Sequence, residues 1–104
     1  MNISFEYLYR DGANYKNWGE VVLRTTTTHE LSEIEQRIRD ELIDGTNFVA
    51  EEIDIPTLYF ATRDKTIDHW WHEYSGVSWT DKAPSNPDTI EELIAKLATS
   101  RSGA

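Results

Sequence analysis

The sequence predicts an α+β domain: a four-stranded antiparallel sheet with two helices, in the order ββαββα, with both helices packed on one face. Three observations predict it. Alternating apolar residues mark strands in each half of the chain, a helical apolar stripe follows each pair of strands, and 104 residues supply one core. We expect a single domain over residues 1–98 and a flexible tail over 99–104, where apolar periodicity is lacking.

The first strand pair is predicted from alternation and a turn signal. Residues 2–10 alternate as a strand. The apolar residues on one of its faces are Ile3, Phe5, Tyr7 and Tyr9. The Asp11-Gly12 pair favours a turn, and "EVVLRTTT" (20–27) alternates again. Together these segments predict a hairpin with a longer loop.

The first helix is predicted within "THELSEIEQRIRDELIDG" (28–45). Ser32 and Glu35 have the S-x-x-E spacing of a capping box, in which each side chain accepts a hydrogen bond from a free backbone donor at the helix start. The residues of its buried stripe are Ile34, Ile38 and Leu42. Gly45 is placed to end the helix.

The second half of the chain repeats this order. We predict a packed connector over 46–56, a third strand in "TLYFAT" (57–62) and a fourth strand that begins in "DHWWHEYSGVSW" (68–79). Asp88, with Glu91 three residues later, starts the second helix. Its apolar stripe consists of Ile90, Leu93, Ile94 and Leu97.

The histidine-containing stretch raises the question of a metal or catalytic site. On a strand, side chains alternate, so His69 and His72 point to opposite faces and cannot share an ion. On a helical turn they would converge, but two adjacent tryptophans and the Ser75-Gly76 pair favour a strand. We therefore predict no metal site, no cofactor and no catalytic residue, while an acid–base pair of Asp68 with His69, or of His72 with a carboxylate from another element, stays open.

The net charge of −9 is concentrated in one part of the chain. Residues 30–54 hold nine acids against Arg37 and Arg39, a net charge of −7. Such a chain repels phosphate backbones and would be attracted to a basic protein surface. Because these arginines lie four residues from glutamates, they favour an ordinary charged helix face over imitation of phosphate groups.

Several features that the sequence lacks also narrow the possible classes of protein. No cysteine occurs, the N-terminus lacks the charged and apolar regions of a signal peptide, and no apolar run is long enough to cross a bilayer. No motif of a serine hydrolase, a phosphate-binding loop or a zinc protease is present. We expect a cytoplasmic protein whose partners are neither nucleic acids nor membranes.

Two surfaces are candidate binding sites. The first is the acidic helix with its connector, whose residues are Glu33, Asp40, Glu41, Asp44, Glu51, Glu52 and Asp54. The second is the end of the sheet where the hairpin tips meet, because aromatic residues in polar loops are candidate anchors for a partner. Its residues are Tyr15, Lys16, Trp18 and His69. In the alternative interpretation, Tyr15 and Trp18 fold back over the sheet edge as part of the core.

The leading hypothesis is a small acidic, non-enzymatic interaction module that binds a basic protein partner, as an inhibitor, immunity-type or antitoxin-like protein. The alternative is a small enzyme or ligand-binding protein at the hairpin end. It would use Tyr15, Lys16, Asp68, His69 and His72. A third hypothesis is a homodimer through an uncovered sheet face, which exposed Tyr7 and Tyr9 would support.

Two segments carry a resemblance. "FEYLYRDGANYKNWGEVV" and "DHWWHE" resemble parts of a group of small uncharacterised bacterial proteins. In that group the N-terminal hairpin and a strand containing histidine and tryptophan are the recognisable features. The resemblance implies a bacterial or phage setting, and it implies no activity, cofactor or catalytic residue.

Overall fold

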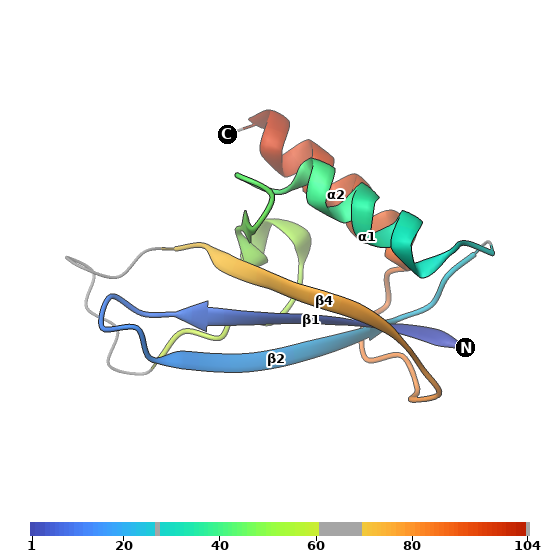
Figure 1. The fold of residues 1–104 in the computed structure, drawn as a ribbon, viewed down its shortest axis with the longest axis horizontal. Coiled ribbons are helices and arrows are strands. Elements are labelled where there is room, and N and C mark those ends of the chain that lie inside the picture. The colour runs from blue at the N-terminus through green and yellow to red at the C-terminus, as the bar shows by residue number, and fades with distance from the viewer. Residues whose placement is uncertain (27, 61–69, 104) are drawn as a thin grey trace.

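A four-stranded antiparallel sheet, in the strand order β2-β1-β4-β3, carries two helices (Figure 1). The computed structural model describes residues 1–26, 28–60 and 70–103. The strands are β1 (Asn2–Arg10), β2 (Lys16–Leu23), β3 (Asn47–Phe48) and β4 (His72–Thr80). The helices are α1 (Leu31–Glu41), α2 (Ile90–Gly103) and the short 3-10 helix η1 (Ala50–Ile53). The predicted α+β class and the ββαββα order are therefore confirmed.

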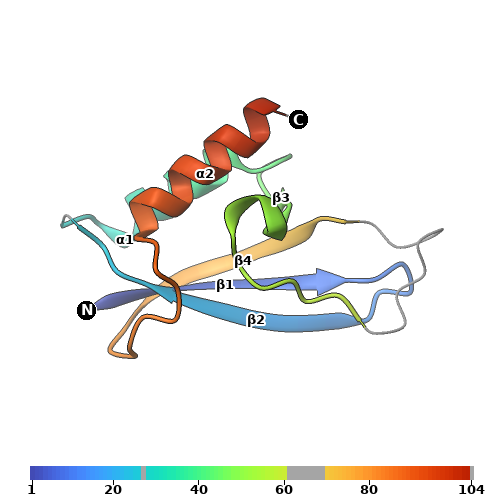
Figure 2. The same cartoon turned by 180° about the vertical axis from the view of Figure 1, so that it is seen from behind.

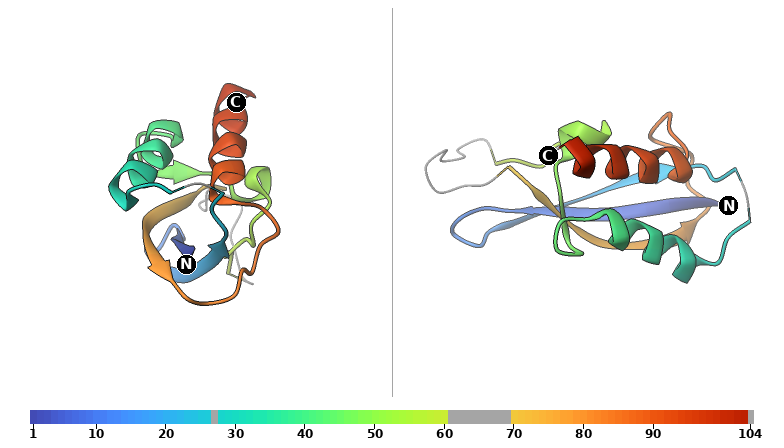
Figure 3. Two further views of the ribbon diagram at one scale, coloured as in Figure 1. Left: turned by 90° about the vertical axis from the view of Figure 1, so that its right-hand side faces the viewer. Right: turned by 90° about the horizontal axis from the view of Figure 1, so that it is seen from above.

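Both long helices lie over one face of the sheet, which we call the inner face; the opposite face is the outer face (Figure 3). Alternate residues of β1 point inward and are at most 1% exposed: Ile3, Phe5, Tyr7 and Tyr9. The helices bury Ile34, Ile38, Ile90, Leu93 and Leu97 against them. The predicted stripes therefore form the core. Because Tyr7 and Tyr9 are buried here, the predicted support for a homodimer through an exposed sheet face is absent.

The first hairpin is tighter than predicted. β2 begins at Lys16, which pairs with Arg10 at the end of β1, and not at residue 20. The Asp11 carboxylate accepts hydrogen bonds from the backbone N–H groups of Ala13 (3.0 Å) and Tyr15 (2.8 Å). One aspartate thus closes the turn, and the chain re-enters the sheet four residues earlier than its apolar alternation indicates.

The predicted third strand is wrong. Residues 57–60 form no strand, residues 61 and 62 lie outside the described part of the chain, and β3 comes from the predicted connector instead. The segment leaves η1 and crosses the sheet toward the start of β2 (Figure 2). Side chains, not a neighbouring strand, bond its backbone: Asn17 Nδ2 donates to the Leu58 carbonyl (3.0 Å), and the Tyr7 hydroxyl donates to the Pro56 carbonyl (2.6 Å).

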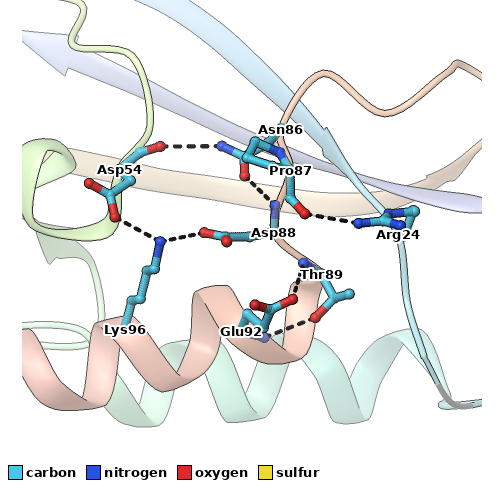
Figure 4. Close-up of polar contacts among 8 residues, drawn as sticks. All are labelled: Arg24, Asp54, Asn86, Pro87, Asp88, Thr89, Glu92 and Lys96. Carbon is cyan, nitrogen blue, oxygen red and sulfur yellow. Dashed lines mark hydrogen bonds and ion pairs between the residues drawn. The ribbon is translucent and has the colours of Figure 1, made fainter.

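Neither capping box forms at the residues predicted for it. Ser32 lies inside α1, whose first residue follows Glu30, and no side-chain hydrogen bond of the described residues caps this end. At α2 the box is one residue later than predicted: the Thr89 hydroxyl accepts from the Glu92 N–H (3.1 Å) and the Glu92 carboxylate accepts from the Thr89 N–H (3.1 Å) (Figure 4). Two otherwise free donors are thereby satisfied.

The helix ends also differ from the prediction. α1 ends at Glu41, before Gly45, which has a φ of 69° and lies in the turn that leads to β3. α2 continues to Gly103, so most of the predicted tail has a helical backbone.

Replacing Thr89 with alanine is expected to lower the free energy of unfolding by about 1 kcal/mol, because the N-terminal cap of α2 is lost. The matched control is Ser32→Ala. This variant removes a hydroxyl that caps nothing in the structure, and we expect a change within about 0.5 kcal/mol. Urea unfolding of the two variants measures both values. An equal loss at Ser32 would contradict the observed start of α1.

Candidate functional site

The seven acids predicted as a binding surface separate into two groups. Asp54 pairs with Lys96 (2.7 Å), Glu33 lies 3.8 Å from the His29 ring, and Asp40 accepts from the neutral side chain of Gln36 (2.8 Å). The other four are Glu41, Asp44, Glu51 and Glu52. Among residues 1–26, 28–60 and 70–100, no lysine or arginine nitrogen lies within 4.0 Å of their carboxylates. We call these four residues the acidic surface.

Asp54 has a structural role. The Lys96 ammonium donates to Asp54 (2.7 Å) and to Asp88 (2.6 Å), and Asn86 Nδ2 donates to the Asp54 carbonyl (3.2 Å) (Figure 4). Hydrogen bonds to the two carboxylates raise the pKa of Lys96 well above its usual range. This network joins the end of η1 to α2, while the Asp54 side chain stays 69% exposed.

Two residues of the acidic surface, Glu41 and Glu52, line a small hollow between α1, β3, η1 and α2. Its lining includes the apolar side chains of Phe48, Val49 and Leu97, with Glu41 and Glu52 also in the lining. The Glu52 carboxylate accepts a hydrogen bond from the Ser100 hydroxyl, which lines the same hollow. Its volume of about 40 Å³ is far below the 300–1,000 Å³ typical of ligand pockets. The hollow therefore suits the end of one side chain and not a substrate molecule.

Glu51 is held by an aromatic neighbour. The Tyr59 hydroxyl lies 3.1 Å from a Glu51 carboxylate oxygen and 2.8 Å from the Trp70 carbonyl. The Tyr59 and Trp70 rings meet edge to face, with 5.8 Å between their centroids. This contact joins the acidic surface to the segment that precedes β4. This contact was not predicted, because the predicted third strand assigned Tyr59 to a hairpin.

The aromatic residues of the first turn are exposed. Tyr15 is 70% exposed and Trp18 is 59% exposed, so neither folds back into the core. Lys16 is exposed beside them, and Trp70 and Trp71 are exposed near the start of β4. The other residues predicted for this end, Asp68 and His69, lie outside the described part of the chain.

His72 does not join Tyr15 and Lys16 in an open site. It lies on the inner face with no exposed surface, and its Nε2 accepts a hydrogen bond from the Leu58 N–H (2.9 Å). The rings of Tyr9 and Tyr59 pack against it, with centroids at 5.2 and 5.1 Å. Lys16 lies on the other face, opposite Arg10. Lys16 and His72 are thus separated by the sheet, and Tyr15 lies in the exposed turn.

Arg10 and Glu73 form an ion pair on the outer face at this end of the sheet, and this pair was not predicted from the sequence. Arg10 Nε donates to Glu73 across the β1–β4 pair (2.8 Å), and Arg10 also donates to the Asn14 side chain. Hydrogen bonding to Glu73 raises the pKa of Arg10. The two residues are far apart in the sequence, and only the register of β1 with β4 reveals that they are neighbours.

These features define a small acidic α+β domain with an uncompensated acidic surface and an aromatic hairpin end. Comparisons with protein-family models, with curated proteins and with solved structures find no match. Across residues 1–26, 28–60 and 70–103, no three histidine, aspartate or glutamate side chains are grouped to hold a metal ion. In the same ranges, no helix is long and apolar enough to cross a membrane.

Proposed function

We propose that this chain is a non-enzymatic interaction module that binds a basic protein partner through the acidic surface. The observation that carries the proposal is the group formed by Glu41, Asp44, Glu51 and Glu52. No lysine or arginine of residues 1–26, 28–60 and 70–100 forms an ion pair with them, and two of them line an apolar hollow. Carboxylates beside an apolar recess match a lysine or arginine, whose apolar stem packs while its charged end pairs.

The position of the acids supports this proposal. α1 and η1 bury their apolar sides against the core through Ile34, Ile38 and Ile53, so their charged sides face outward. Glu41, Glu51 and Glu52 therefore lie on helical elements, which lowers the entropy cost of binding, and Asp44 lies in the turn that follows α1. An inhibitor, an immunity-type protein or an antitoxin-like protein would use such a surface, and the proposal includes the bacterial or phage setting that the resemblance to small bacterial proteins implies.

The test is capture of a partner from lysate by two variants with equal net charge. The first, Glu41→Gln/Glu52→Gln, changes the acidic surface. The control, Glu6→Gln/Asp81→Asn, removes two exposed acids elsewhere. We expect the first variant to lose at least about tenfold in retention and the control to bind as the native chain does.

Salt provides the second measurement. Screening weakens contacts between exposed charges, so the captured partner should elute as ionic strength rises. Equal loss in both variants would show that total charge, and not this surface, is responsible. A partner that resists salt and both variants would overturn the proposal.

A further inference from the structure

β2 is an edge strand, and its register shows which backbone groups point away from the sheet. The Asp11 N–H donates to the Tyr15 carbonyl (3.0 Å), so residues 11 and 15 form a hydrogen-bonded pair. In an antiparallel ladder such pairs alternate with pairs that are not hydrogen-bonded. The register of β1 with β2 therefore directs the N–H and C=O groups of Lys16, Trp18, Glu20 and Val22 outward.

One of these positions is already occupied. The connection from β4 to α2 passes around the edge, where the Ser85 hydroxyl accepts from the Val22 N–H (2.8 Å) and the Ser85 N–H donates to the Val22 carbonyl (2.9 Å). These bonds confirm the outward direction of the alternate residues. No such bond of the described residues reaches the backbone of Lys16, Trp18 or Glu20. The open edge is therefore bounded by Ser85 at one end and by the turn at Asn14, with a φ of 70°, at the other.

The charges on the outer face leave Lys16 unbalanced. Cross-strand pairing places Arg10 opposite Lys16 and Glu6 opposite Glu20, and like charges in these positions are unfavourable. Arg10 is relieved by Glu73 (2.8 Å), and Glu20 by Lys82 (2.6 Å). Lys16 has no carboxylate within 4.0 Å in the described chain.

We propose that β2 pairs antiparallel with β2 of a second copy, with a two-fold axis at Trp18. In this register Lys16 faces the partner's Glu20, Glu20 faces the partner's Lys16, and the two Trp18 side chains are opposite each other. All three open residues are paired, and neither Ser85 nor the turn is disturbed. A shift by one pair in either direction would need Val22, which is occupied, or Asn14, which is in the turn.

The dimer joins two sheets into one. It satisfies backbone groups that an edge strand otherwise leaves open, and it places Trp18, which is 59% exposed, against an aromatic partner. The paired surface is small, so the dimer is expected to form reversibly with concentration.

Charge exchange tests this register. Lys16→Glu places like charges opposite each other twice, and so does Glu20→Lys/Lys82→Glu, in which the second substitution retains the internal ion pair in reversed form. Each variant alone should dimerise at least about tenfold more weakly than the native chain, whereas a mixture should restore the dimer, because both facing pairs are then opposite in charge. Sedimentation velocity measures this from about 1 µM to about 1 mM.

A cysteine provides a readout that does not depend on affinity. The chain contains no cysteine. In Trp18→Cys the two sulfur-bearing residues would face each other at a Cα separation of about 5.5 Å, which a disulfide can span. Mild oxidation should therefore give a covalent dimer, whereas the exposed control Ser75→Cys should not. A native chain that stays monomeric throughout, or a dimer that both charge variants form unchanged, would overturn the proposal.

Discussion

Replacing His72 with alanine is expected to lower the free energy of unfolding by about 3–5 kcal/mol, the range for truncating a buried aromatic side chain. His72 has no exposed surface and packs against Tyr9 and Tyr59. Its Nε2 also accepts the Leu58 N–H, which would be left buried without this acceptor. Because a domain of this size is stable by roughly 5–15 kcal/mol, the variant should be close to unfolding at room temperature. Urea unfolding at neutral pH measures the loss.

Two further variants separate the ring from its acceptor. His72→Phe retains an aromatic ring but removes the acceptor, so it should lose about 1–3 kcal/mol. His72→Gln retains an acceptor for Leu58 but leaves a gap beside Tyr9, so its loss reflects packing. A loss of less than about 1 kcal/mol in His72→Ala would contradict a structural role for this histidine.

Much of the sheet could be predicted because alternation reports directly on burial. Ile3 through Tyr9 alternate over a long run, and the face that they define is the core face. His72 and Tyr74 share that face, as the strand interpretation of their segment predicts. The extended backbone begins at His72, so Asp68 and His69 remain predictions outside the described residues.

The path of residues 57–60, predicted as a strand, could not be derived from the sequence. A short apolar run does not reveal which groups will form hydrogen bonds with its backbone. Leu58 lies against Gly19, where an added Cβ would approach the Leu58 Cδ2 to 2.9 Å. The segment thus packs its apolar side chains on the sheet while the side chains of Asn17 and His72 bond its backbone. β3 is two residues long and too short for any periodic signal.

The acidic residues show that the binding surface, too, could be predicted only in part from the sequence. Sequence spacing identified all of them, but it could not separate Asp54, which joins η1 to α2 through Lys96, from Glu41 and Glu52, which line the hollow. That separation depends on contacts between residues more than forty positions apart. Charge content is a property of the sequence, whereas its availability to a partner is a property of the fold.

Raising the pH above 10 is expected to destabilise the fold steeply, through Tyr7 and Tyr74. Burial raises the pKa of Tyr7 from 10.0 to about 12. Burial, followed by the charge and hydrogen bond of Glu35, raises the pKa of Tyr74 further. In the unfolded chain both phenols ionise near pH 10. Between pH 10 and 12 the unfolded state therefore holds fewer protons than the folded state, and stability falls as pH rises.

The expected slope is about 1.4 kcal/mol per pH unit for each tyrosine, so Tyr7 alone removes roughly 3 kcal/mol by pH 12. Below pH 10 its contribution is fully present. Urea unfolding at intervals from neutral pH to pH 12 measures the slope in the native chain and in Tyr7→Phe/Tyr74→Phe. The double variant starts lower, because the hydrogen bond from Tyr7 to the Pro56 carbonyl is lost, but its stability should fall less with pH. If both proteins lose stability above pH 10 at the same rate, these two phenols do not control the alkaline transition.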